Sequence, residues 1–312
     1  MSRVWIWLWT IPACEGGDLD AIVAKAKEHR VGVMVKTSDG LATHGDWDPK
    51  HLSPDLLARL RDAGVPVRSW AYVYPTVDLA GQAEVVLRPA TDAILDAEGE
   101  WDGHAAEAQQ LVSDLLARKG TRLVGYAPLP IVSYHDGAGQ YEEFNRLDLA
   151  CPQAYAGTGG RDAIGALTWT QREWDRAFAR CNIEPAVYAA DQDPADLRAA
   201  IAFVRAQVRS FGADGDVSVW SWQHMTDEHW AVIDEFTKED EMLSEADKTW
   251  LEEMVEGKVI AARDHIEARV AAQLSDGIEA RFKALIGSSA LSARPVTTGP
   301  SSAEPREPRD PS

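Results

Sequence analysis

The sequence predicts an α/β fold: a (β/α)8 TIM barrel followed by a long C-terminal helix and a disordered tail. Short apolar runs alternate with amphipathic segments along the first 238 residues. The runs are nearly continuous, as in parallel strands covered on both faces. Eight such pairs in about 240 residues match the size of a barrel. A doubly wound open sheet is the alternative, but Thr10-Ile11-Pro12 stands where that fold carries a glycine-rich loop.

Each predicted strand is a short apolar run, and each predicted helix is the amphipathic segment that follows it. The strands are Val4–Thr10, Val31–Lys36, Val67–Tyr74, Ala93–Asp96, Leu123–Ala127, Leu147–Tyr155, Ala186–Ala190 and Val217–Trp222. The helices are Asp18–His29, Ser53–Ala63, Leu79–Leu87, Asp102–Arg118, Tyr141–Asn145, Gln171–Arg180, Pro194–Phe211 and Asp227–Phe236. Ser53 before Pro54 is a typical helix start, Asp102 is the expected cap of the fourth helix, and Gly64 and Gly120 are typical stops.

The pattern changes after residue 240, so we expect three parts: a barrel over residues 1–240, a helical segment over 241–287 and a Pro/Ser-rich disordered tail over 288–312. Apolar residues recur through the segment from Leu251 to Leu285, and a helix this long cannot bury that stripe alone. We therefore expect a homo-oligomer formed through residues 244–286. The alternative is that the helix folds back on the barrel.

Composition narrows the range of partners. The net charge of −19 argues against nucleic acid or an anionic membrane surface, and it leaves a neutral sugar polymer open. No apolar run reaches the length of a membrane span, so membrane insertion is not expected. The cysteines are odd in number and lack metal-ligand spacing, so neither a metal nor a disulfide framework is predicted. No cofactor is predicted either.

The most informative segment is the end of the fourth strand. Positions i and i+2 of a strand point the same way, so Asp96 and Glu98 should project together from its C-terminal end. Two carboxyl groups placed in this way suit acid/base chemistry on a glycosidic bond. The alternative is that these acidic residues only complement the dipole of the following helix.

In a barrel the other strand ends should face the same site. They supply aromatic rings, amides and charged groups, a composition that suits a carbohydrate. The predicted substrate-binding residues are Trp7, Trp9, Lys36, Asp39, Trp70, Tyr72, Tyr126, Gln153, Tyr155, Tyr188, Trp222 and Gln223. For some of them a structural role is equally open: a buried ion pair for Lys36, a turn for Asp39, and core positions for the tyrosines.

Three short motifs resemble the family-25 glycoside hydrolases, lysozyme-type muramidases with a barrel fold. They are Asp96-Ala97-Glu98, Pro152-Gln153-Ala154-Tyr155 and Trp220-Ser221-Trp222-Gln223. The resemblance implies that Glu98 is the general acid and Asp96 the second carboxylate, with Gln153, Tyr155 and Trp222 along the sugar subsites. That family carries an aspartate at the end of strand one, whereas this chain has Trp9-Thr10 there. This departure leaves room for a barrel that binds sugar without cleaving it.

The stretch Leu243–Trp250 resembles a segment of lysins and tail proteins from phages of actinobacteria. With no signal-peptide pattern at the N-terminus, it implies a phage protein made in the cytoplasm and released at lysis or carried on the virion. We therefore weigh two functions. The first is a hydrolase of a cell-wall or cell-surface glycan, above all peptidoglycan. The second is a virion or tail protein that binds host glycan and assembles through its C-terminal helix, in contact with other virion proteins.

Overall fold

The computed structural model describes residues 3–43, 53–135, 139–178, 182–190, 192–207 and 215–238. Within these ranges the chain forms one curled sheet in which neighbouring parallel strands follow the order β7-β6-β5-β4-β2-β1-β9-β8, and the short β3 pairs antiparallel with β2. The strands are β1 (Val4–Leu8), β2 (Gly32–Asp39), β3 (Ala42–Thr43), β4 (Val67–Tyr72), β5 (Asp92–Asp96), β6 (Val124–Ala127), β7 (Leu149–Ala150), β8 (Ala186–Tyr188) and β9 (Val217–Trp220). The predicted α/β barrel architecture is confirmed as a TIM-barrel-like fold.

The two ends of this strand path are joined by backbone contacts. Isolated parallel bridges pair Ala150 with Ile183 and Gln153 with Ala186. The amide of Glu184 also donates to the carbonyl of Ala150 at 2.8 Å. The sheet therefore returns from β8 to β7, and its strand ends gather around one mouth.

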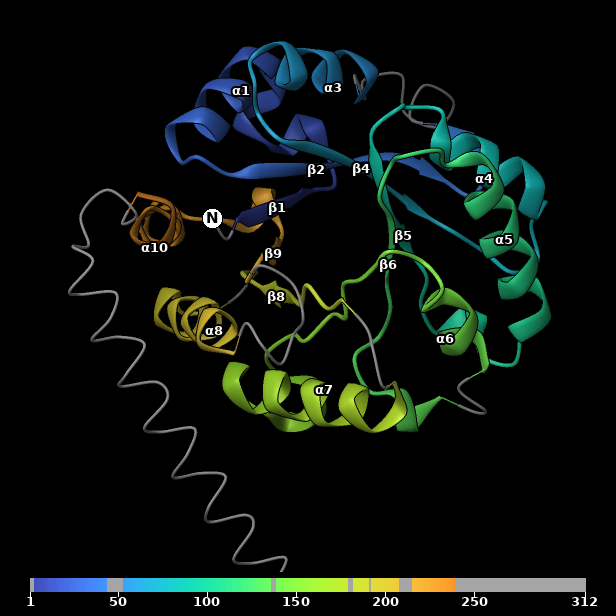
Figure 1. Ribbon diagram of the computed structural model, residues 1–312. Helices are drawn as coiled ribbons and strands as arrows, with labels where there is room; N and C mark the ends of the chain where they lie inside the picture. Colours follow the sequence, from blue (N-terminus) through green and yellow to red (C-terminus); the bar gives the residue numbers. More distant parts are fainter. Residues whose placement is uncertain are drawn as a thin grey trace, which may run out of the picture. The chain divides into compact units, whose positions relative to one another are not determined.

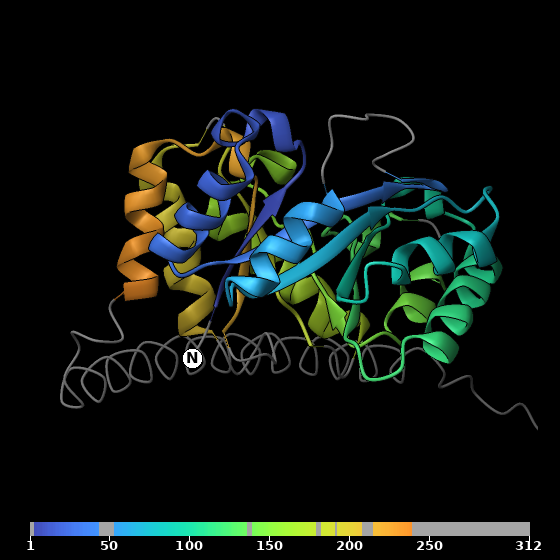
Figure 2. The ribbon, with the colours of Figure 1, turned by 90° about the horizontal axis from the view of Figure 1, so that it is seen from above.

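Helices surround the sheet on its outside (Figure 1), and in Figure 2 the light-blue α3 lies over β2 and β4. They are α1 (Leu19–Glu28), α3 (Ser53–Asp62), α4 (Leu79–Leu87), α5 (Ala105–Arg118), α6 (Gly139–Phe144), α7 (Ala163–Ala177), α8 (Pro194–Ala206) and α10 (Asp227–Lys238). Across the described ranges, none of them has the length and apolar character to cross a membrane. The predicted 241–287 helix and 288–312 tail lie outside the described residues, and the three-part division of the chain stays a prediction.

Two predicted helix starts were wrong. α5 begins at Ala105, because Asp102 instead ends the 3-10 turn η3 (Gly99–Trp101) and its carboxylate is engaged by side chains of other segments. α7 begins at Ala163, well before the predicted Gln171. Its cap is Asp162, whose Oδ1 accepts the amide of Gly165 at 2.7 Å.

Alternate residues of each strand pack into two separate apolar cores. One set, which includes Ile6, Val35 and Leu95, packs in the large core shared with the helices, which we call the outer core. The other set fills the interior of the curled sheet: Trp5, Trp7, Met34, Trp70, Ile94, Ala127, Leu149 and Cys151. Because side chains alternate along a strand, the interior set continues upward into the residues that line the mouth.

Candidate active site

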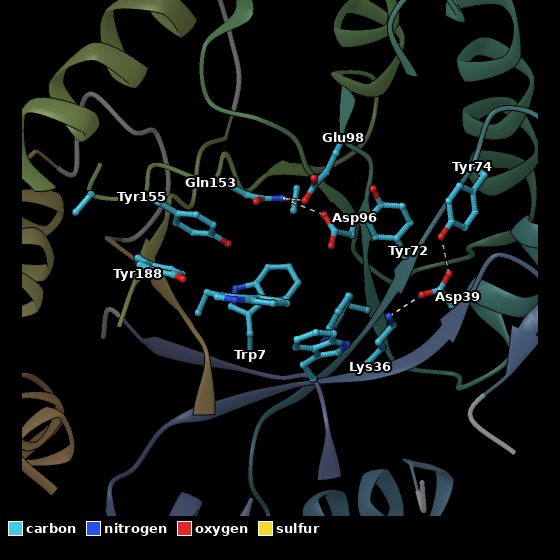
Figure 3. A pocket seen from close by; sticks show the side chains of 15 residues that line it. Trp7, Lys36, Asp39, Tyr72, Tyr74, Asp96, Glu98, Gln153, Tyr155 and Tyr188 are labelled. Carbon is cyan, nitrogen blue, oxygen red and sulfur yellow. Dashed lines mark hydrogen bonds and ion pairs between the residues drawn. The ribbon is translucent and has the colours of Figure 1, made fainter. Parts of the chain in front are cut away.

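A pocket of about 650 Å³ opens where the strands end (Figure 3). This is the position expected for the site of a barrel of this kind. The predicted site residues that line it are Trp7, Trp9, Lys36, Asp39, Trp70, Tyr72, Asp96, Glu98, Gln153, Tyr155 and Tyr188. The structure therefore brings together predicted residues from six strand ends that are far apart in the sequence.

The two carboxyl groups predicted from the fourth strand converge in this pocket. Asp96 is the last residue of β5, and Glu98 precedes the turn η3, while Ala97 between them packs in the outer core. Gln153 Nε2 donates to Asp96 Oδ1 at 3.0 Å and to Glu98 Oε1 at 2.8 Å. One amide thus holds both carboxyl groups, and Figure 3 shows this bridge at the pocket wall.

The environments of the two carboxyl groups differ. Asp96 is buried and Glu98 is half-buried at the pocket surface. Burial raises the pKa of Asp96 well above its usual range, and the charge of Glu98 and a hydrogen bond with it raise that pKa further, whereas the nearby Lys36 opposes the shift. Asp96 therefore keeps a proton under conditions where an ordinary aspartate is ionised.

A bulge in β2 forms the charged side of the pocket. The β2–β4 register pairs Lys36 with Trp70 and Ser38 with Ala71, which leaves Thr37 as the extra residue. The extra residue reverses the alternation of side chains, so Lys36 and Asp39 both face the pocket. Lys36 Nζ lies 2.8 Å from Asp39 Oδ2 and 5.0 Å from the centroid of the Trp70 ring. Lys36 thus forms an ion pair within the pocket, and this pair joins a buried lysine to a half-buried aspartate.

Two tyrosines lie beside this charged side, and each donates to a carboxylate. Tyr74 Oη donates to Asp39 Oδ1 at 2.8 Å, and Tyr72 Oη lies 2.9 Å from both carboxylate oxygens of Glu100. Burial, followed by the hydrogen bond to Asp39, raises the pKa of Tyr74 to about 12. The pKa of Tyr72 is also raised, first by burial and then by its hydrogen bond to Glu100. Both hydroxyls therefore stay protonated, and each donates its proton to a carboxylate.

Aromatic rings form the rest of the wall. Trp7, Trp70 and Trp220 contact one another, with ring centroids 5.4 to 5.8 Å apart. Trp9, at 42% exposure, lies at the rim with its ring centroid 6.1 Å from that of Trp220. Beside them, Tyr188 pairs with Trp220 in the sheet register, and the rings of Tyr155 and Tyr188 lie 4.9 Å apart (Figure 3).

Three predicted binding residues do not line the pocket. Tyr126 faces the outer core, where its hydroxyl donates to Asn145. Trp222 is 2% exposed in the 3-10 turn η6 (Trp222–His224) and packs on Trp230 of α10. Gln223, in the same turn, is absent from the pocket wall. The placements of Trp222 and Gln223 follow from the end of β9 at Trp220, after which strand alternation no longer applies.

Four lining residues were not among the predicted ones: Tyr74, Ala127, Ala156 and Trp220. Two of them could have been found from alternation. Trp220 pairs with Trp7 in the sheet register, and Tyr74 follows Tyr72 at the i+2 position. Within the described ranges, no group of three or more His, Cys, Asp or Glu side chains is arranged to hold a metal ion.

No protein-family model matches the chain, and no curated protein matches it either. Solved structures do match its fold. The active domain 2 of a thermostable chitinase from Pyrococcus furiosus, crystallised as catalytic-site mutants with chito-oligosaccharides, has a TM-score of 0.57 and 13% identity over 78% of this chain and 97% of its own. The spore cortex-lytic enzyme SleL of Bacillus cereus has a TM-score of 0.52 and 9% identity, covering 74% of this chain and 73% of its own. At these identities the likeness concerns the fold.

Proposed function

We propose that this protein is a glycoside hydrolase that cleaves a cell-wall or cell-surface glycan, with peptidoglycan or a chitin-like polymer of N-acetylated sugars as the substrate class. The observation that carries the proposal is the Asp96–Glu98 pair, held by Gln153 at the mouth of an aromatic-walled pocket. The likeness of the fold to a chitinase and to a cortex-lytic enzyme agrees with it.

Glu98 is the proposed general acid, because it is the more exposed of the two carboxyl groups and faces the pocket. In the resting enzyme the buried Asp96 retains a proton, because its pKa is raised by burial. As the glycosidic bond breaks, that proton passes from Asp96 to Glu98 and from Glu98 to the leaving oxygen, which leaves both carboxyl groups ionised. The negative charge then faces the positive, oxocarbenium-like sugar, or an intermediate formed with its N-acetyl group.

The walls supply binding and orientation. The half-buried ring of Trp220 and the exposed ring of Trp9 offer apolar surface to the C–H faces of sugar rings, and the buried rings of Trp7 and Trp70 support Trp220 from below. The hydroxyls of Tyr72 and Tyr74 donate their protons to Glu100 and Asp39, so their oxygens offer acceptors to sugar hydroxyls. Such a combination of aromatic surface and few placed polar groups is typical of small-molecule and sugar sites.

A glycan-binding protein without hydrolytic activity is the second candidate. The observation that favours it is the end of β1, where Trp9 and Thr10 stand and no acid is present. The remaining carboxylate of the pocket wall, Asp39, is already engaged by Lys36 and Tyr74. A virion or tail location and membership of the family-25 hydrolases rest on the sequence resemblances and form the finer part of the proposal.

Clearing of substrate gels separates the two candidates. Wild-type protein and Glu98→Gln are run in gels that contain purified peptidoglycan or chitin, and binding to the same polymers is measured by sedimentation. The hydrolase predicts clearing by wild type alone, with binding by both. Binding by both proteins without any clearing would instead identify a non-catalytic binding module.

A further inference from the structure

Large apolar side chains are exposed at one face of the described part of the chain. They are Trp9, Leu41 and Tyr134, whose exposed fractions are 42%, 44% and 68% respectively. Each belongs to a loop that follows the C-terminal end of a strand: β1, β2 and β6 respectively. All three therefore lie around the mouth of the barrel, on loops that follow different strands.

Tyr134 is the most exposed of them and belongs to a small cluster outside the pocket. Its ring centroid lies 5.2 Å from that of Trp169 on α7, at an interplanar angle of 82°. Arg161 Cζ lies 3.7 Å from the centroid of the same Trp169 ring. We call Tyr134, Trp169 and Arg161 the outer cluster. It combines an accessible aromatic ring with a guanidinium group that can donate hydrogen bonds.

The outer cluster is fixed relative to the carboxyl pair. The neighbour of Tyr134 in the sequence, His135, contacts Asp102: its Nδ1 lies 2.8 Å from Asp102 Oδ1. Asp102 follows Glu98 by four positions in the chain. On the other side of Tyr134, the amide of Ser133 donates to Glu173 Oε2 on α7 at 3.0 Å. A ring held at both neighbouring residues loses little conformational entropy when a ligand covers it.

The outer cluster is also continuous with the pocket wall. Tyr155 and Ala156 line the pocket, and the tight loop that follows leads directly to Arg161. Two backbone bonds close this loop: Thr158 N to Tyr155 O at 3.1 Å and Gly157 N to Arg161 O at 2.7 Å. A ligand that leaves the pocket past Tyr155 therefore meets the outer cluster next.

The strand order places the outer cluster across the mouth from Trp9. From β1, the path to β6 takes four steps through β2, β4 and β5, and four steps through β9, β8 and β7. The carboxyl pair on β5 is next to β6, so it lies between the two aromatic positions. A single sugar cannot contact both, whereas a chain of sugars can.

We propose that the outer cluster is a remote sugar-binding subsite, and that the ligand is a polymeric glycan bound across the mouth, with the scissile bond inside the chain. This inference deepens the proposed function and rests on it for the class of ligand. The C–H face of one sugar stacks on the Tyr134 ring, and Arg161 donates to a hydroxyl or acetamide oxygen of that sugar.

Calorimetry with two ligands tests this subsite. The parent is the full chain with Glu98→Gln, titrated with chitobiose and with chitohexaose; Tyr134→Ala and Tyr134→Phe are added to it. Tyr134→Ala should weaken chitohexaose binding roughly three- to tenfold, the range of one lost aromatic contact, and leave chitobiose binding unchanged. Tyr134→Phe keeps the ring and should bind both as the parent does.

Equal chitohexaose affinity in Tyr134→Ala and the parent would overturn the subsite, as would an equal loss for both sugars. The proposed hydrolysis is judged separately, by product release from the wild type. If the wild type releases no product while the length-dependent loss persists, the subsite stands and the hydrolase proposal fails. If the parent binds neither sugar, the subsite proposal fails, and product release by the wild type still decides the hydrolase proposal.

Discussion

At the scale of single residues, the central feature is a pair of carboxyl groups in unequal surroundings. Asp96 and Glu98 share one hydrogen-bond donor, Gln153, but Asp96 is buried and Glu98 reaches the pocket. Positions i and i+2 on a strand were enough to predict that the pair would converge. The raised pKa of Asp96 could not be predicted, because it depends on burial by residues remote in the sequence.

The raised pKa of Asp96 predicts a dependence of stability on pH. The native state keeps a proton that the unfolded chain releases near pH 3.8, so stability falls as pH rises from that value through the raised native pKa. Asp96→Asn removes the titrating group. The free energy of unfolding of the variant relative to wild type should therefore increase with pH across this window.

Urea unfolding of both proteins between about pH 4 and about pH 9 measures this difference. The comparison cancels the titration of groups common to both proteins. A difference that stays constant over the whole range would mean that Asp96 has an ordinary pKa in the native state.

At the scale of elements, strand alternation decided which predicted residues entered the site. Alternation correctly indicated Trp7, Trp70 and Tyr72. It could not tell which face of β6 points inward, so Tyr126 was chosen where Ala127 lines the pocket. The bulge at Thr37 is likewise invisible in the sequence, since strict alternation would place Lys36 and Asp39 on opposite faces.

The end of β9 at Trp220 gives a paired prediction for two tryptophans. Trp220 lines the pocket, so Trp220→Ala should weaken chito-oligosaccharide binding by about fivefold or more in the folded protein. Trp222 is buried against Trp230, so Trp222→Ala should lower the free energy of unfolding by about 3–5 kcal/mol. Its folded fraction should bind sugar normally.

Thermal unfolding and calorimetry at a temperature where both variants are folded provide the two readouts. Some loss of stability is expected for Trp220→Ala as well, because the ring packs on Trp7 and Trp70. The assignment fails if Trp222→Ala weakens binding in its folded fraction while Trp220→Ala does not.

At the scale of the whole molecule, the fold was largely predictable because eight strand–helix units repeat one simple pattern. Helix ends were less predictable: Asp102 has the residue type of a cap, but its carboxylate accepts from Gln140 and pairs with His135 instead. Closure of the sheet through Ala150 and Gln153 gathers all the strand ends in one place. That arrangement turns scattered aromatic and acidic residues into one pocket.

The segment 244–286 predicts self-association of the full chain. Its apolar stripe needs a partner surface, so the full chain should run as an oligomer in light scattering coupled to size exclusion. A chain that ends at residue 240 should run as a monomer. Equal monomeric mass for both would show that the stripe is covered within one chain.

The central claim, that Glu98 delivers the proton to a glycosidic bond, is tested most directly by the rate of reducing-end release. Wild type is compared with Glu98→Gln and with Glu107→Gln, a matched control on the exposed side of α5. We predict a loss of about 10²- to 10⁴-fold in kcat for Glu98→Gln, with unchanged thermal stability and little change for Glu107→Gln. Wild-type turnover in Glu98→Gln would contradict the claim.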